Sequence, residues 1–147
     1  MIDGSGSYLT EPEHGFLLDD LIVPMAAYFT IDGIVGWDAG FWAWTPDRSN
    51  HVKIVNYTGM QSLTYQDDGI DLVDEDQAVV MNHVIVISRN DCYSTKTWGP
   101  NGLAKHWPGE PEVVSNVLIH NAVAWTTDGA FKVGQGDFQS QSRVTVV

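Results

Sequence analysis

Residues 113–132, VVSNVLIHNAVAWTTDGAFK, combine the longest alternating apolar run of the chain with a sharp turn signal. In an extended strand, alternate residues lie on opposite faces. One face would carry Val117, Ile119, Val123 and Trp125, with Asn121 as the polar exception, and the other Leu118, His120, Ala122 and Ala124. Asp128-Gly129 suits a tight hairpin turn because both residues tolerate positive φ. We therefore expect Ala130–Val133 to fold straight back on this strand.

A second apolar run, Gln77–Arg89, is rich in β-branched residues, which favours a strand over a helix. Strict alternation would put Val79, Met81, Ile85 and Ile87 on one face, and Val80, Val84 and Val86 on the other. Both faces are therefore apolar. This pattern is typical of a central strand covered on both sides, or of one that meets the core on one face and another subunit on the other.

Shorter strand candidates and turns fill the rest of the chain. Leu21–Ile31 leads into a second hairpin signal, Asp32-Gly33, and no stretch has a helical period. The only internal similarity, between Tyr28–Gly33 and Ala124–Gly129, is short, and common turn chemistry explains it. We expect an all-β protein: residues 1–20 form an N-terminal arm, and 21–147 form one antiparallel β-sandwich, jelly-roll-like, with about eight strands. An up-and-down barrel is the alternative.

Composition excludes several classes of function. Nineteen acidic residues against seven Lys and Arg give a net charge of −12, which disfavours nucleic acids and anionic membrane surfaces as partners. The single cysteine, Cys92, excludes a scaffold stapled by intrachain disulfides. The sequence shows no signal peptide and no transmembrane segment. We therefore expect a virion or cytoplasmic location.

One acidic cluster could bind a cation. Six carboxylates lie within residues 67–76, and the candidate ligands for calcium are Asp67, Asp68, Asp71 and Asp74. The spacing does not match an EF-hand loop. Solvated turns on either side of a short strand are the interpretation we favour, since acidic runs usually face water. Apart from this cluster, the sequence predicts no cofactor.

Aromatic residues mark a candidate binding surface. The segment 99–111 is rich in Pro and Gly and predicts a long loop, a common place for binding residues. Exposed tryptophans can stack on sugars or anchor a protein partner, whereas buried ones fill the core. The candidate binding residues are Trp98, Lys105, His106 and Trp107 around this loop, and Trp42 and Trp44 in an aromatic strand.

No catalytic motif stands out. The chain lacks Gly-x-Ser-x-Gly, metal-type histidine spacing and a phosphate-binding glycine loop. The leading hypothesis is therefore a non-enzymatic structural protein that assembles as a homo-oligomer with other structural proteins, such as a capsid decoration or tail protein of a virus or phage. One alternative is a carbohydrate-binding module with a glycan as its partner. The other is a small hydrolase or isomerase that uses carboxylates as acid and base, which would show as two acids converging in a deep pocket, one with a raised pKa.

Overall fold

The computed structural model describes residues 2–3, 8–9, 16–17, 21–39, 42–61, 67–73, 77–97, 113–134 and 140–147. These residues form strands and their connections, with no helix, so the expectation of an all-β chain is confirmed. The segments 1–20 and 21–147 were predicted as an arm and a domain. Of the first, the structure describes three two-residue strands, β1 (Ile2–Asp3), β2 (Tyr8–Leu9) and β3 (Phe16–Leu17).

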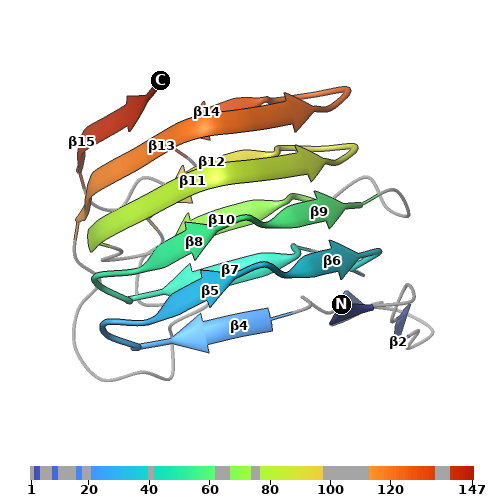
Figure 1. The fold of residues 1–147 in the computed structure, drawn as a ribbon, viewed down its shortest axis with the longest axis horizontal. Coiled ribbons are helices and arrows are strands. Elements are labelled where there is room, and N and C mark those ends of the chain that lie inside the picture. The colour runs from blue at the N-terminus through green and yellow to red at the C-terminus, as the bar shows by residue number, and fades with distance from the viewer. Residues whose placement is uncertain are drawn as a thin grey trace.

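The chain winds into a parallel β-helix, in which each coil stacks on the one before (Figure 1). The small sheet has five strands in the order β14-β12-β10-β7-β4. Their bounds are β4 (Leu21–Pro24), β7 (Trp44–Asp47), β10 (Ile70–Val73), β12 (Tyr93–Lys96) and β14 (Phe131–Val133). Every pairing in this sheet is parallel.

The large sheet has eight strands, and it also pairs in parallel throughout. Besides β1 it contains β5 (Thr30–Asp32), β6 (Val35–Trp37), β8 (Lys53–Val55), β9 (Thr58–Met60), β11 (Gln77–Ile87), β13 (Val114–Trp125) and β15 (Gln141–Val146). The long strands β11 and β13 each span the width that β8 and β9, or β5 and β6, cover as pairs. Only β2 and β3 pair antiparallel among the described strands.

The predicted antiparallel, jelly-roll-like sandwich of about eight strands is therefore wrong. The two Asp-Gly signals predict hairpin turns, but neither reverses the chain onto its own neighbour. Asp128-Gly129 leads from β13 in the large sheet to β14 in the small sheet, and Asp32-Gly33 lies between β5 and β6, both in the large sheet. Asp128-Gly129 lies at a corner between the two sheets, whereas Gly33, in the left-handed conformation, interrupts a strand within the large sheet. The up-and-down barrel is excluded by the same parallel pairing.

A column of left-handed residues explains why both long strands look apolar on two faces. Gly33, Asn56, His83 and Asn121 occupy one register position on four successive coils, with φ between 50° and 69°. Each shifts the alternation of its strand by one residue.

The predicted faces therefore hold only up to this column. Before it, Met81 and Ile119 point into the core as expected. After it, Ile85 and Ile87 on β11, and Val123 and Trp125 on β13, point outward with 38–73% of their surface exposed. The polar exception Asn121 is the residue that causes the change on β13.

The core lies between the two sheets and is built from stacked side chains. Ile31, Ile54, Met81 and Ile119 occupy one register row of the large sheet and are buried. Trp44, Ile70 and Tyr93 form the corresponding row of the small sheet. Burying an aliphatic or aromatic side chain stabilises the fold by about 1.5–3 kcal/mol. The stacks therefore supply the main stabilisation between coils.

Candidate functional site

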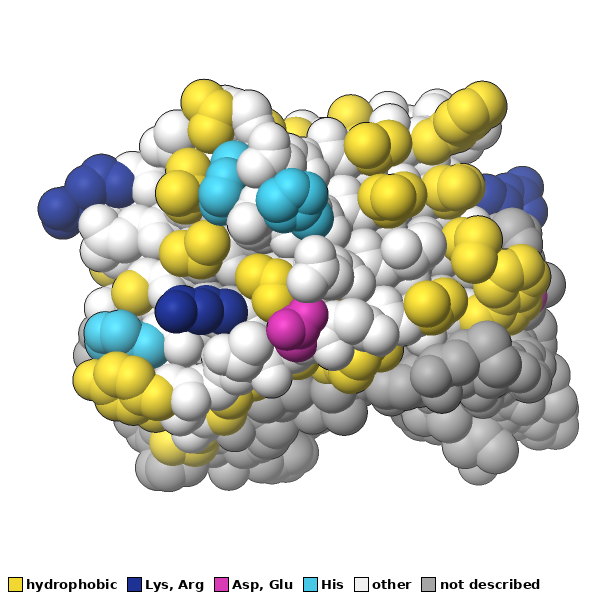
Figure 2. Space-filling model, in the orientation of Figure 1, with side chains coloured by type: hydrophobic (Ala, Val, Ile, Leu, Met, Phe, Trp, Pro, Cys, Tyr) yellow, Lys and Arg dark blue, Asp and Glu magenta, His cyan; other side chains and the backbone are white. Residues whose placement is uncertain are grey.

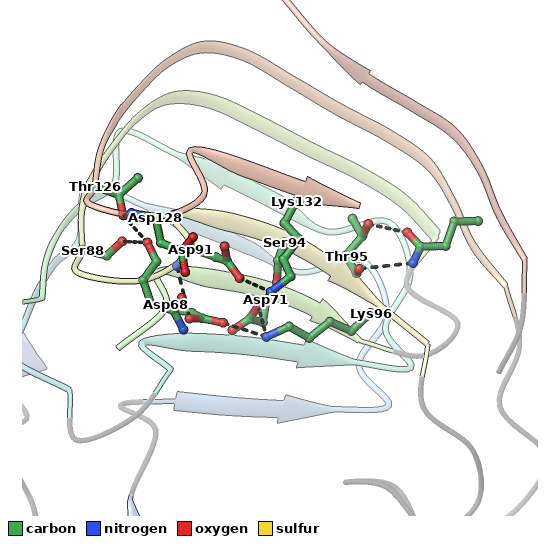
Figure 3. Close-up of polar contacts among 12 residues, drawn as sticks. Asp68, Asp71, Ser88, Asp91, Ser94, Thr95, Lys96, Thr126, Asp128 and Lys132 are labelled. Atoms are coloured by element: carbon green, nitrogen blue, oxygen red, sulfur yellow. Dashed lines mark hydrogen bonds and ion pairs between the residues drawn. The ribbon is translucent and has the colours of Figure 1, made fainter. Parts of the chain in front are cut away.

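The outer face of the small sheet carries a buried polar cluster. Ile70 and Leu72 of β10 belong to the hydrophobic core, so the intervening Asp71 lies on the opposite face. In the same register row, Ser94 of β12 is also buried, and Lys132 of β14 is partly exposed. Figure 3 shows these side chains gathered along one face of the sheet.

Two aspartates lie side by side just before the small-sheet strands. The amide of Gly69 donates to Asp91 O (2.8 Å), and the amide of Ala43 donates to Asp68 O (3.0 Å), which continues the parallel ladder beyond the strands. Trp42, Asp68 and Asp91 therefore occupy one row on three successive coils. Adjacent strands lie about 4.8 Å apart, so the two aspartates lie next to each other, just before the amino-terminal ends of β10 and β12.

Lys96, the last residue of β12, joins two of the carboxylates. Its Nζ lies 2.7 Å from Asp68 Oδ2 and 2.7 Å from Asp71 Oδ1, and all three side chains are at most 3% exposed. The same ammonium lies 3.6 Å from the centroid of the Trp42 ring, in a cation–π contact. Lys96 is thus held by two carboxylates and one aromatic face.

Burial raises the pKa of both carboxyl groups. The pKa of Asp71 lies well above its ordinary value of 3.8, because the group is completely buried; Lys96 and a hydrogen bond from Ser94 Oγ offset only part of this effect. Asp71 Oδ2 is buried without a hydrogen-bond partner among the described residues. Burial also raises the pKa of Asp68, against the opposing charge of Lys96. Both carboxyls therefore hold a proton at a higher pH than an exposed aspartate does.

Asp91 takes part in a second ion pair, which reaches the surface. Its Oδ2 lies 2.7 Å from Nζ of Lys132, whose side chain is 38% exposed. The hydrogen bond to Asp91 raises the pKa of Lys132. Gly129 occupies the next coil in this row, and a Cβ there would overlap Asp91 Oδ1. The glycine leaves the space that the carboxylate fills.

Three of the four predicted calcium ligands lie close to this cluster. Asp67 accepts a hydrogen bond from the amide of Arg89 (3.2 Å), Asp68 accepts one from the amide of Asp91 (3.3 Å), and Asp74 lies outside the described residues. An ammonium, that of Lys96, lies between Asp68 and Asp71. Across the described part of the chain, no group of three His, Cys, Asp or Glu side chains is arranged to hold a metal ion.

Of the six predicted binding residues, the structure describes two, Trp42 and Trp44, and both are buried. Trp44 is a core residue, 1% exposed, and packs edge-on against Tyr57. Trp42 is 4% exposed and contacts Lys96. Trp98, Lys105, His106 and Trp107 lie outside the described residues.

Cys92 adjoins the cluster but points into the core. It is buried, and burial raises the pKa of its thiol, which disfavours the nucleophilic thiolate. Nucleophilic cysteine chemistry therefore has no support here.

Sequence reasoning found the acidic cluster but missed Asp91, Lys96 and Lys132. These residues come from other coils and become neighbours of Asp68 only through parallel pairing. A signal was present: 68–73 (DGIDLV) and 91–96 (DCYSTK) each begin with aspartate two residues before a small-sheet strand, and Asp128 lies three residues before β14. Such a weak repeat is recognisable once a solenoid is considered.

No family model matches this chain, and the comparisons with curated proteins and with solved structures found no match. Within the described ranges, no helix has the length and apolar character needed to cross a membrane.

Proposed function

We propose that this chain is a carboxylate-dependent hydrolase that cleaves glycosidic bonds. The observation that carries the proposal is the placement of Asp68 and Asp91 on adjacent coils, each just before a strand of the small sheet and each in a different environment. Hydrolysis of a glycoside needs one carboxyl group that donates a proton and one carboxylate that acts as base or nucleophile. The sequence alternative required two acids converging in a deep pocket, one with a raised pKa; the neighbouring positions of Asp68 and Asp91 and the raised pKa of Asp68 support it.

The two environments suggest the two roles. The raised pKa of Asp68 suits a general acid, which must hold its proton until the leaving oxygen takes it. Asp91 faces the partly exposed Lys132 and suits the second carboxylate, which activates water or attacks the sugar directly. Lys132 and the exposed Asp128 lie where the cluster meets solvent, so a substrate would approach from that side.

Shape and charge favour a neutral glycan. Solenoids offer extended surfaces that suit linear polymers, and the net charge of −12 opposes a polyanionic substrate.

The test is release of reducing ends from a panel of neutral polysaccharides, including glucans, mannans and xylans. We expect one of them to be cleaved. Asp68→Asn and Asp91→Asn should each lower the rate by about 10²–10⁴-fold with an unchanged circular dichroism spectrum. Asp32→Asn, on the exposed outer face of the large sheet, is the matched control and should retain activity. No cleavage across the panel, or full activity in both site variants, would contradict the proposal.

A second candidate function is self-association, the hypothesis that led from the sequence. An exposed apolar patch favours it: Trp37, Ile87 and Trp125 share one row of the large sheet, beside Ile85 and Val123. Figure 2 shows hydrophobic side chains gathered over this end of the sheet. Contiguous apolar patches commonly mark protein interfaces.

Light scattering at micromolar concentration tests this candidate. The wild-type chain should be larger than a monomer, and Trp125→Asp should shift it to a monomer. Val133→Asp, a change at an exposed valine on the small sheet, is the control and should leave the assembly intact. A strictly monomeric wild-type chain would remove its main support. A role in a virus or phage particle stays a prediction from the sequence.

A further inference from the structure

The contacts of Lys96 exceed what a simple ion pair requires. Its ammonium is shared between Asp68 and Asp71 at equal distances of 2.7 Å, and it also lies against the Trp42 ring. A long, flexible lysine side chain is thereby fixed at three points in a site with almost no solvent exposure. Burying a charged side chain in this way costs free energy unless its charge is paired and its hydrogen bonds are made.

Asp71 is placed to hold Lys96 rather than to react. Its carboxyl is fully buried, and Oδ1 receives both Lys96 Nζ and Ser94 Oγ. Asp68 is nearer to a reacting position, because its row contains Asp91 and its Oδ1 accepts the amide of Asp91. The chain of contacts therefore runs from Ser94 through Asp71 and Lys96 to Asp68.

We propose that Lys96 is a positioning residue, which fixes the carboxyl group of Asp68 beside Asp91, and that Asp71 and Trp42 hold Lys96 for this task. The inference rests on the proposed function, in which Asp68 is the acid. Burial raises the pKa of Asp68, Lys96 lowers it and the charge of Asp91 raises it. The charge of Lys96 thus opposes the uptake of a proton by Asp68.

Other charged groups lie near Asp68 on the neighbouring coils and in its own segment. Asp91 lies on the next coil, Lys132 binds Asp91 from the coil beyond, and Asp128 acts on Lys132. Asp67 precedes Asp68 in the chain, and on β7 Asp47 occupies the register row of Val73 and Lys96. Among the described residues, Lys96 is the one that contacts both Asp68 and Asp71.

A carbon-13 NMR titration of the aspartate carboxyl groups in the full chain tests this inference without any substrate. The Asp68 resonance is assigned by its absence in Asp68→Asn. The pKa of Asp71 is raised more strongly than that of Asp68, so Asp71 is already protonated where Asp68 titrates, and Asp71→Asn should leave the pKa of Asp68 near its wild-type value. In Lys96→Gln the charge of the lysine is lost, and we expect the pKa of Asp68 to rise, whereas Lys96→Arg should keep it nearer the wild-type value.

Lys132→Gln is the matched control, since this lysine contacts Asp91 and not Asp68. It should move the Asp68 resonance less than Lys96→Gln does. If Lys96→Gln does not fold, Lys96→Met, which keeps the length of the side chain without its charge, replaces it. An Asp68 titration unchanged in the folded variant that lacks the charge of Lys96 would overturn the inference. A failed hydrolysis screen would instead overturn the proposed function, so the two failures are distinguishable.

Discussion

The side-chain amide of Asn121 donates a 2.9 Å hydrogen bond to Oδ1 of Asn82 on the preceding coil. On the two preceding coils, the side-chain amide of Asn56 donates the same kind of hydrogen bond to Oδ1 of Asp32, at 2.8 Å. Asn56 and Asn121 both belong to the left-handed column, with φ of 52° and 50°. Asparagine tolerates this conformation and at the same time ties one coil to the next.

Asn121→Gly should therefore destabilise the chain less than Asn121→Ala. Both changes remove the hydrogen bond, worth about 0.5–1.5 kcal/mol. Only alanine adds the penalty of a left-handed conformation, about 1–2 kcal/mol. Within a strand, glycine is ordinarily the worse residue, so the expected order is reversed here. Urea denaturation measures it, and an alanine variant as stable as the glycine variant would contradict the role of the backbone.

The same column shows what the sequence could and could not predict. Strand content followed from β-branched and aromatic runs, and Asp32-Gly33 and Asp128-Gly129 did mark places where strands end. Whether such a turn makes a hairpin or a corner depends on pairing with residues a whole coil away. Nothing within the turn itself carries that information. The apolar character of β11 on two faces was a sign of parallel pairing, but it also reflected the shift at His83.

The candidate site was predictable to the same extent. Asp68 and Asp71 lie close together in the sequence and were found as a cluster. Their relation to Lys96 and Asp91 arises from the register of β10 with β12, which is a long-range property. An exposed acidic turn was the favoured interpretation, and it was wrong for Asp67, Asp68 and Asp71, which are all buried.

Two glycines in the core make room for one tyrosine, and a pair of substitutions can test this. A Cβ on Gly36 would lie 2.6 Å from the hydroxyl of Tyr57 but 3.4 Å from the ring carbons. A Cβ on Gly59 would lie 2.7 Å from the hydroxyl and 2.9 Å from ring carbon Cε1. Each Gly→Ala change should cost about 1–3 kcal/mol through overpacking. Tyr57→Phe should rescue Gly36→Ala but only weakly rescue Gly59→Ala, as measured by thermal unfolding of the double variants. Equal rescue at both positions would contradict the geometry.

Tyr93 links the two sheets through its hydroxyl. This group donates toward Val123 O (2.8 Å) and Val84 O (3.2 Å), both in the large sheet, whereas Tyr93 itself belongs to the small sheet. Tyr93→Phe should lower the free energy of unfolding by about 1 kcal/mol, because it leaves the ring in the core and removes one buried hydrogen bond. Chemical denaturation measures the loss, with Tyr28→Phe, at an exposed tyrosine, as the neutral control.

The buried carboxyl of Asp71 should make stability depend on pH. Its pKa is raised in the folded chain above the ordinary 3.8, so the folded state binds a proton more tightly than the unfolded state does. Protonated Asp71 therefore favours folding at low pH, and this contribution is lost as pH rises from about 4 through the raised folded pKa. Asp71→Asn cannot ionise and should lack this loss, so its stability relative to wild type should increase with pH over that window. Urea denaturation at a series of pH values measures the difference. Thr45→Val, a change in the same register row with no titratable group, should differ from wild type by a constant amount. A constant difference for Asp71→Asn as well would show that Asp71 is ionised in the folded chain across the whole range.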